Sequence, residues 1–307
     1  MANLRRNHEK APAGAFMTKS GLFLALIGLL FAGFKFFGGN DRAASGTRVV
    51  INAPEENDHT NPNHSSSELL LPTVKNGYVV NHDYYSLSYD EKNEQAEWVA
   101  YYISRKRLNN KKAKRKEWFE KDPLVRTGSA TYKDYKGSGY DKGHMASAAD
   151  MAFSEQAMED CFYMSNMSPQ VHNFNGGIWR ELEELSRDWG RANNKLYVVT
   201  GPIFKDNLGT IGRQNKVTVP GYYYKILVDL EGAEKKAIGF VMPNATSNKP
   251  VSAFVKTIDE IEEITGIDFF PELEDDLENE LESKVNISKW TFNKNLYKVR
   301  TQKWNIR

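Results

Sequence analysis

Cysteine is nearly absent from this sequence: Cys161 is the single thiol among 307 residues. One thiol excludes an intrachain disulfide, a thiolate zinc cage and a CxxC redox pair. Cys161 lies in an apolar, strand-like run, "DCFYMSNM" (residues 160–167). A buried free cysteine is more common in such a run than a catalytic nucleophile. We therefore expect Cys161 to be a small core residue.

An excess of either charge is also lacking, because 41 Lys and Arg residues offset 40 Asp and Glu residues. A net charge of +1 does not indicate a polyanionic partner, so any basic surface must be local. Residues 105–116 ("RKRLNNKKAKRK") hold eight Lys or Arg residues, and residues 271–283 hold seven acids. The basic run predicts either a surface for a phosphate backbone or a solvated loop. The acidic run predicts a solvated surface.

Uncharged apolar runs are scarce except near the N-terminus, in residues 21–34 ("GLFLALIGLLFAGF"). This length suits a signal peptide and is short for a membrane span, but Lys35 can snorkel and extend it to residue 37. Basic residues precede the run, so the positive-inside rule places residues 1–20 in the cytoplasm. We expect residues 21–37 to be a transmembrane or signal-anchor segment. The residues that follow this segment would lie outside the cytoplasm, either in the periplasm or outside the cell. The alternative is that the segment is a signal peptide and the protein is secreted after its cleavage.

The remainder divides into a flexible linker, residues 38–76, and a compact domain, residues 77–307. The linker is rich in Pro, Asn, His and Ser and shows no periodicity. Aromatic and β-branched enrichment predicts strands at 84–90, 96–104, 195–204, 222–230 and 236–244. Helices are expected at about 176–190 and 251–264. This alternation predicts an α+β fold.

Histidine is also rare, with six in the chain. His8, His59 and His64 precede the expected domain, and His82 lies at its edge. His144, in "GYDKGHMASAADM" (residues 139–151), and His172 remain as candidates for chemistry. A lone imidazole is either a packed core residue or a general base.

An amphipathic helix is indicated downstream by an apolar stripe at Ile178, Leu182, Leu185 and Trp189. Asn175 precedes this stripe. Asparagine is a favoured helix N-cap, and its amide oxygen is also a hard, neutral ligand suited to Mg²⁺. Spacing alone does not decide between the two roles.

Three blocks of residues together resemble one known family. "YDKGHMASAAD", then "NMSPQ" (residues 166–170), then "NGGIWRELE" (residues 175–183) are similar in order and pattern to the DNA/RNA non-specific endonucleases, the ββα-metal nucleases. Further pieces, "YVVTGPIF", "VPGYYYKI" and "TGIDFF", extend the resemblance over roughly residues 77–270. Three ordered blocks are a far stronger signal than any one of them.

The resemblance implies an α+β fold with a mixed central antiparallel sheet, flanking helices and a ββα-metal motif at the active site. A strand carrying His144, a second strand through about residues 162–167 and a helix beginning near Asn175 would together grip one divalent ion. The ion implied is Mg²⁺, with Mn²⁺ as the alternative. His144 would be the general base, and His172, which matches no motif position, the alternative base.

The resemblance also assigns roles to five other residues. Asn175 would bind the ion directly and Glu183 through a water molecule. Asn166 would be a polar substrate-binding residue. Lys142 and Arg187 would contact the phosphate and assist catalysis; Lys142 stands where the family usually has arginine, and lysine cannot form a bidentate fork. The alternative for Glu183 and Arg187 is an ordinary i,i+4 surface pair.

The function implied is a metal-dependent, sugar-non-specific endonuclease that hydrolyses phosphodiester bonds of DNA and RNA. One alternative is a membrane-anchored nucleic-acid-binding protein with the same fold and no turnover. A phosphodiesterase for small substrates is a third, disfavoured because such a substrate needs no long cationic surface. Family members often dimerise, so a homodimer is also expected.

Overall fold

The computed structural model describes residues 70–305. The predicted cytoplasmic segment 1–20, the anchor 21–37 and the linker up to residue 69 lie outside the described residues, so those assignments stay predictions. Within residues 70–305, none of the helices combines the length and the apolar character that a membrane span requires.

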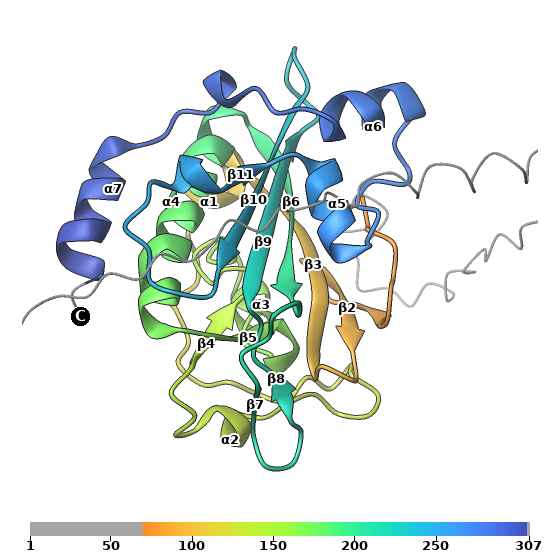
Figure 1. The fold of residues 1–307 in the computed structure, drawn as a ribbon, viewed down its shortest axis with the longest axis vertical. Coiled ribbons are helices and arrows are strands. Elements are labelled where there is room, and N and C mark those ends of the chain that lie inside the picture. The colour runs from red at the N-terminus through yellow and green to blue at the C-terminus, as the bar shows by residue number, and fades with distance from the viewer. Residues whose placement is uncertain (1–69, 306–307) are drawn as a thin grey trace, which may run out of the picture. The chain divides into compact units, whose positions relative to one another are not determined.

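A seven-stranded antiparallel sheet forms the centre of the fold (Figure 1). Its strands lie in the order β1-β2-β3-β6-β9-β10-β11. Their bounds are β1 Tyr78–Asn81, β2 Ser86–Asp90, β3 Gln95–Ser104, β6 Lys195–Ile203, β9 Tyr222–Asp229, β10 Lys236–Pro243 and β11 Val255–Lys256. The predicted α+β class with a central antiparallel sheet is confirmed, and five of these strands match the predicted strand positions.

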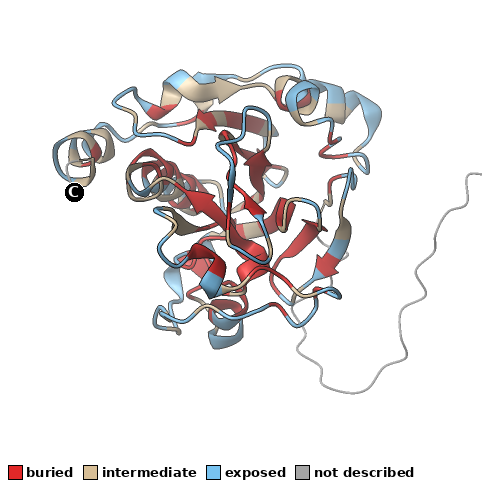
Figure 2. Ribbon diagram, turned by 60° about the horizontal axis from the view of Figure 1, so that its bottom comes forward, coloured by how far each residue is buried: buried red, intermediate tan, exposed pale blue. Residues whose placement is uncertain are grey.

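The two faces of the sheet belong to two separate cores, because side chains alternate along each strand. On β3, Val99 and Tyr101 face the core that also contains helix α4 (Arg180–Ala192). Trp98 and Ala100 face the core covered by α5 (Ile258–Thr265) and α6 (Asp275–Glu282). In Figure 2 the central strands are buried, whereas exposed residues lie on the outer helices and loops.

Shorter helices and strands surround the seven-stranded sheet. The helices are α1 Arg105–Asn109, α2 Tyr132–Tyr135, α3 Glu155–Asp160 and α7 Lys294–Val299. The two-stranded sheets are β4 Asp141–His144 with β5 Met167–Gln170, and β7 Thr210–Ile211 with β8 Val217–Thr218. Short 3₁₀ or π turns occur at Met164–Asn166, Phe174–Trp179, Val251–Phe254, Ile287–Lys289 and Arg300–Trp304.

The helix predicted at 251–264 is wrong in its first half. Residues 255–256 instead pair with the edge of β10, where Phe240 lies opposite Val255. Helix α5 begins only after Thr257. The Thr257 hydroxyl accepts a hydrogen bond from the Glu260 backbone N–H (3.1 Å). In return, the Glu260 carboxylate accepts a hydrogen bond from the Thr257 N–H (2.9 Å). This capping box fixes where the helix starts.

Two other predicted boundaries also need correction. The strand predicted at 162–167 begins later, at Met167, because the Asn166 backbone N–H bonds to the Tyr163 carbonyl in a 3₁₀ turn. The predicted linker end at residue 76 lies inside the folded part: the Thr73 N–H donates to the Asp268 carbonyl (2.8 Å) and the Lys75 N–H to Glu97 Oε1 (2.9 Å). The strand predicted around Cys161 is also wrong, because Cys161 directly follows helix α3. The thiol is buried as expected, and burial raises its pKa.

Candidate active site

The two-stranded sheet formed by β4 and β5 carries His144, which lies opposite Met167. The preceding residue must be small, because a Cβ atom on Gly143 would lie 2.1 Å from the side chain of Gln170. Glycine therefore leaves room for the Gln170 side chain to pack against the strand that carries His144. The predicted strand for His144 is confirmed.

Asn166 holds the chain immediately after His144. Its Nδ2 donates to the carbonyls of Ala146 (3.0 Å) and Cys161 (2.8 Å), and its Oδ1 accepts from the Ala146 N–H (2.8 Å). The residue is fully buried. Its amide is thus engaged with the backbone and not directed toward a substrate, so its position in the structure favours a positioning role over the predicted substrate contact.

His144 is buried between aromatic rings, with 8% of its surface exposed. The Phe162 ring meets it edge-on at 4.7 Å between centroids, and the Phe119 ring lies 5.9 Å away. Burial, together with the positive charges of Arg115 and Lys142, lowers the pKa of His144 to about 3. The imidazole is therefore neutral at physiological pH.

The Nε2 atom of His144 is buried and has no hydrogen-bond partner among the described residues. Buried polar atoms in native proteins are nearly always paired, with protein or with water. A neutral imidazole keeps a lone pair on one of its two nitrogens and is able to accept a proton there from a bound water molecule. This arrangement suits a general base better than a packed core histidine.

Asn175 does not cap a helix, so that alternative is wrong. It lies inside the wide turn Phe174–Trp179, which Asn173 begins, before α4 starts at Arg180. Its Nδ2 donates to Asp141 Oδ2 at 2.9 Å. Because this bond fixes the orientation of the amide, Oδ1 is left as the atom that can take a cation.

Asp141 connects the two halves of the site and was not assigned a role from the sequence. It lies on the same strand as His144 and bonds Asn175 from the turn before α4. The exposed His172 also contacts it, with Nδ1 3.0 Å from Asp141 Oδ2. The only sequence signal for Asp141 was its place in the first motif block, because its partner lies 34 residues away.

Arg187 is buried and does not form the surface pair with Glu183 that was one of the expectations. Only 6% of it is exposed, and its Nη1 lies 3.0 Å from Asp150 Oδ1 while its Nη2 lies 3.2 Å from Glu184 Oε2. Asp150 also accepts a hydrogen bond from the Tyr101 hydroxyl (3.0 Å). Arg187 is therefore held in place by an internal network.

Glu183 shares this interior with Lys225, a second residue that the sequence analysis missed. Burial raises the pKa of Glu183 to about 7, although the charges of Arg187 and Lys225 oppose the shift. Burial lowers the pKa of Lys225 to about 8. A lysine in the middle of the apolar strand "YYYKILVDL" was the available signal, because buried lysines are rare unless paired.

Lys142 and the end of the basic run lie on the open side of His144. The Lys142 ammonium is 4.8 Å from the Phe119 ring centroid and 4.9 Å from that of Tyr132. Arg115 stacks on Phe162 at 5.3 Å, which brings the C-terminal end of residues 105–116 to the site. Arg107, in contrast, is buried with its guanidinium 3.6 Å from the Tyr102 ring centroid. The run is thus partly structural.

The donors at this site fit a divalent ion with few protein ligands. Asn175 offers an oriented, neutral amide oxygen. Glu183, to which the family resemblance gives a metal-bound water, would offer a carboxylate. Mg²⁺ commonly keeps several of its waters and binds through one or two protein groups. The residues present are therefore compatible with the ion that the motif implies.

The raised pKa of Glu183 predicts a pH-dependent stability in the metal-free protein. An acid whose pKa is about 7 in the folded state and near 4.5 in the unfolded state destabilises the fold as pH rises through 7. Glu183→Gln should therefore raise the free energy of unfolding by about 1–3 kcal/mol at pH 8 and leave it unchanged at pH 4. Thermal or urea unfolding at both pH values measures this, with the exposed Glu263→Gln as the control. A destabilised Gln variant at pH 8 would contradict it.

Comparisons with known proteins identify a matching family and similar proteins. The sequence profile of the DNA/RNA non-specific endonuclease family matches residues 67–276. Human mitochondrial endonuclease G is 35% identical over 202 residues, covering 62% of this chain and 68% of the relative. A nuclease from Nostoc is 32% identical over 240 residues, covering 74% and 84%.

A solved structure is similar as well. A chain in the crystal structure of the EndoG/EndoGI complex superposes with a TM-score of 0.60 at 32% identity, covering 64% of this chain and 87% of that one. The profile match spans most of the compact domain. The chain belongs to the DNA/RNA non-specific endonuclease family and is an endonuclease.

Proposed function

We propose that the protein is a metal-dependent, sugar-non-specific endonuclease that hydrolyses phosphodiester bonds in DNA and RNA with His144 as the general base. One observation carries the assignment: His144 has a neutral imidazole whose Nε2 has no partner among the described residues, on the strand that also orients Asn175 through Asp141. A structural histidine would have both nitrogens satisfied or exposed.

The side chains around His144 favour proton transfer. Phe119 and Phe162 shield the imidazole and keep it neutral, and Asn166 fixes the backbone that follows it. A positioned base contributes roughly 10²–10⁴ in rate. Lys142 brings a positive charge close to His144, which suits a phosphate bound next to the base. Its single ammonium replaces the forked contact of an arginine.

The family depends on a divalent ion, and we propose Mg²⁺ here, with Mn²⁺ as the alternative. Asn175 Oδ1 would bind the ion and Glu183 would hold one of its waters. When bound, the ion would stabilise the charge that develops on the phosphate and the departing oxygen. Arg187, held by Asp150 and Glu184, keeps positive charge next to Glu183 and favours the ionised carboxylate that this role requires.

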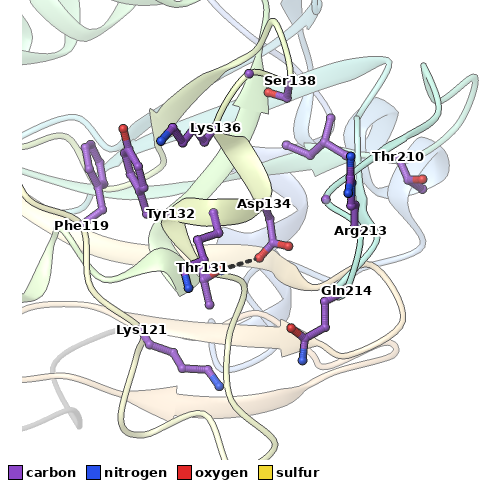
Figure 3. A pocket seen from close by; sticks show the side chains of 14 residues that line it. Phe119, Lys121, Thr131, Tyr132, Asp134, Lys136, Ser138, Thr210, Arg213 and Gln214 are labelled. Carbon is purple, nitrogen blue, oxygen red and sulfur yellow. Dashed lines mark hydrogen bonds between the residues drawn. The ribbon is translucent and has the colours of Figure 1, made fainter.

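A groove of about 970 Å³ leads away from this site and suits a nucleic acid strand (Figure 3). Phe119, the ring next to His144, is one of its lining residues, and Figure 3 shows Tyr132 beside Phe119 and Arg213 on the opposite side. Four cations line the groove: Lys121, Lys133, Lys136 and Arg213. The single acid, Asp134, is buried and bonded to Thr131 and Asn215.

These features match what a single-stranded region of a nucleic acid requires. Cations attract the phosphates without reading sequence, and exposed aromatic rings stack on bases of any identity. Tyr132 is 48% exposed. We therefore propose that the strand flanking the scissile phosphate lies between Tyr132 and Arg213. Attachment to a membrane through residues 21–37, with the catalytic domain outside the cytoplasm, and a homodimer also remain proposals.

The test of the assignment compares the full-length protein with His144→Ala on supercoiled plasmid and on RNA, with Mg²⁺ or with EDTA. We expect wild type to cleave both polymers only with the metal, and the alanine variant to be slower by about 10² or more. His172→Ala is the matched control and should retain most activity. Equal cleavage by His144→Ala, or cleavage in EDTA, would refute the assignment. Binding without cleavage by wild type would favour the non-catalytic alternative.

The proposed role of the groove predicts that substitutions in it weaken nucleic-acid binding independently of cleavage. In a His144→Ala background, which prevents cutting, Arg213→Ala should weaken binding to a single-stranded oligonucleotide and reduce its salt dependence by about one phosphate contact. Tyr132→Ala should weaken binding by about 1–3 kcal/mol through lost stacking. Fluorescence anisotropy measures both, and Lys284→Ala, an exposed lysine following α6, is the control. Unchanged affinity in both groove variants would place the strand elsewhere.

A further inference from the structure

A second cluster of carboxylates lies far from the His144 site, on the opposite face of the sheet. It is formed by Asp259 and Glu262 on α5 and by Glu282 at the end of α6. Figure 1 shows α5 and α6 beside each other at the upper right, whereas α4 covers the other face. The family match ends at residue 276, so Glu282 lies beyond the shared region. No role in the nuclease reaction accounts for this cluster.

The three side chains converge closely. One oxygen atom from each lies within 4.8 Å of the others, and this is the only such group of three His, Cys, Asp or Glu residues within 70–305. The Phe269 backbone N–H donates to Glu262 Oε1 at 2.9 Å, which orients that carboxylate and leaves its second oxygen available. Asp259 is exposed, Glu262 is partly buried and Glu282 is buried, so the cluster is open to solvent on one side.

The burial of Glu282 is an independent indication of a ligand at this cluster. Only 6% of its surface is exposed, and its Oε1 is shielded from solvent and has no hydrogen-bond partner among the described residues. The neighbouring Leu281 packs into the second core, and this contact carries Glu282 inward. A buried carboxylate without a donor or counter-charge is costly, and in native proteins such groups are paired or bind a metal.

The charges that shift the pKa of Glu282 most are all negative. Burial raises its pKa to about 8, and the charges that raise it further are those of Glu262, Glu278, Asp259 and Asp268. Burial and neighbouring carboxylates raise the pKa of Glu262 as well. No lysine or arginine is among the groups that shift either pKa most. The cluster therefore requires either protons or an external cation.

We propose that Asp259, Glu262 and Glu282 bind a calcium ion that joins α5 to α6. Ca²⁺ takes six to eight oxygen ligands at about 2.3–2.6 Å in flexible geometry, so two oxygens of one shell can be up to about 4.8 Å apart. Carboxylates at this separation can bind Ca²⁺ with little movement. Mg²⁺, at about 2.0–2.1 Å and with strict octahedral geometry, would require a tighter cluster. Water would complete the coordination on the open side.

The ion would act on stability and not on catalysis. It neutralises the carboxylates and attaches α6 to the core that α5 covers. Affinity in the range of extracellular calcium modules, a Kd of about 10⁻⁴–10⁻³ M, is expected for three carboxylates at a partly exposed site. Binding at this strength raises the thermal midpoint when Ca²⁺ is present at millimolar concentration.

The experiment uses the full-length chain carrying Asn175→Ala, so that the metal ligand proposed at the His144 site is removed. Calorimetric titration with CaCl₂ should show one saturable site, and Ca²⁺ should raise the thermal midpoint relative to EDTA. Glu282→Gln in the same background should weaken calcium binding by tenfold or more and abolish the rise. Glu280→Gln, which removes the same charge from an exposed position on α6, is the matched control and should bind as before.

A further variant covers the case in which Glu282→Gln does not fold. Asp259→Asn changes an exposed side chain on α5, which places the fold at little risk, and should weaken binding similarly. MgCl₂ should raise the midpoint less than CaCl₂ at equal concentration. No saturable calcium binding, calcium binding that survives both Glu282→Gln and Asp259→Asn, or a larger response to Mg²⁺ would overturn the proposal. The first of these outcomes would indicate that Glu282 is held as a neutral acid.

Discussion

The hydrogen bond from Asn175 to Asp141 is the contact on which the catalytic arrangement depends. It joins the strand of the proposed base to the turn that carries the proposed metal ligand. Without it the Asn175 amide could rotate and present nitrogen in place of oxygen to the ion. With it, a single carboxylate sets the position of Asn175 relative to His144. The family resemblance names both ends of this arrangement, and the structure supplies the link between them.

Three buried ionisable groups close to this contact have shifted pKa values. Aromatic rings and two cations keep His144 neutral, whereas burial raises the pKa of Glu183 and lowers that of Lys225. The shifts have one main cause, which is burial against a closely packed sheet. The same sheet separates this chemistry from the carboxylates of α5 and α6, which face the second core. The two proposed metal sites can therefore be removed independently.

Local patterns were sufficient to predict the central strands and α4, because these elements are set by alternation and by an apolar stripe that a single segment carries. Local patterns gave wrong predictions where a contact with a residue far away in the sequence determines the structure. Residues 251–264 look helical, but 255–256 pair with β10 instead. Arg187 looks like a surface residue at i,i+4 spacing, and it is buried because Asp150 lies 37 residues before it. Asn175 is equally suited to a cap and to a ligand until Asp141 is seen to hold it.

The most direct test of the account is the metal dependence of cleavage by Asp141→Ala. Loss of a group that orients a metal ligand typically weakens metal affinity by 10- to 100-fold. We predict that the Mg²⁺ concentration for half-maximal plasmid cleavage rises at least tenfold, and that saturating Mg²⁺ restores much of the rate. An unchanged half-maximal Mg²⁺ concentration, with or without a lower maximal rate, would contradict the claim that Asp141 orients Asn175 toward the ion.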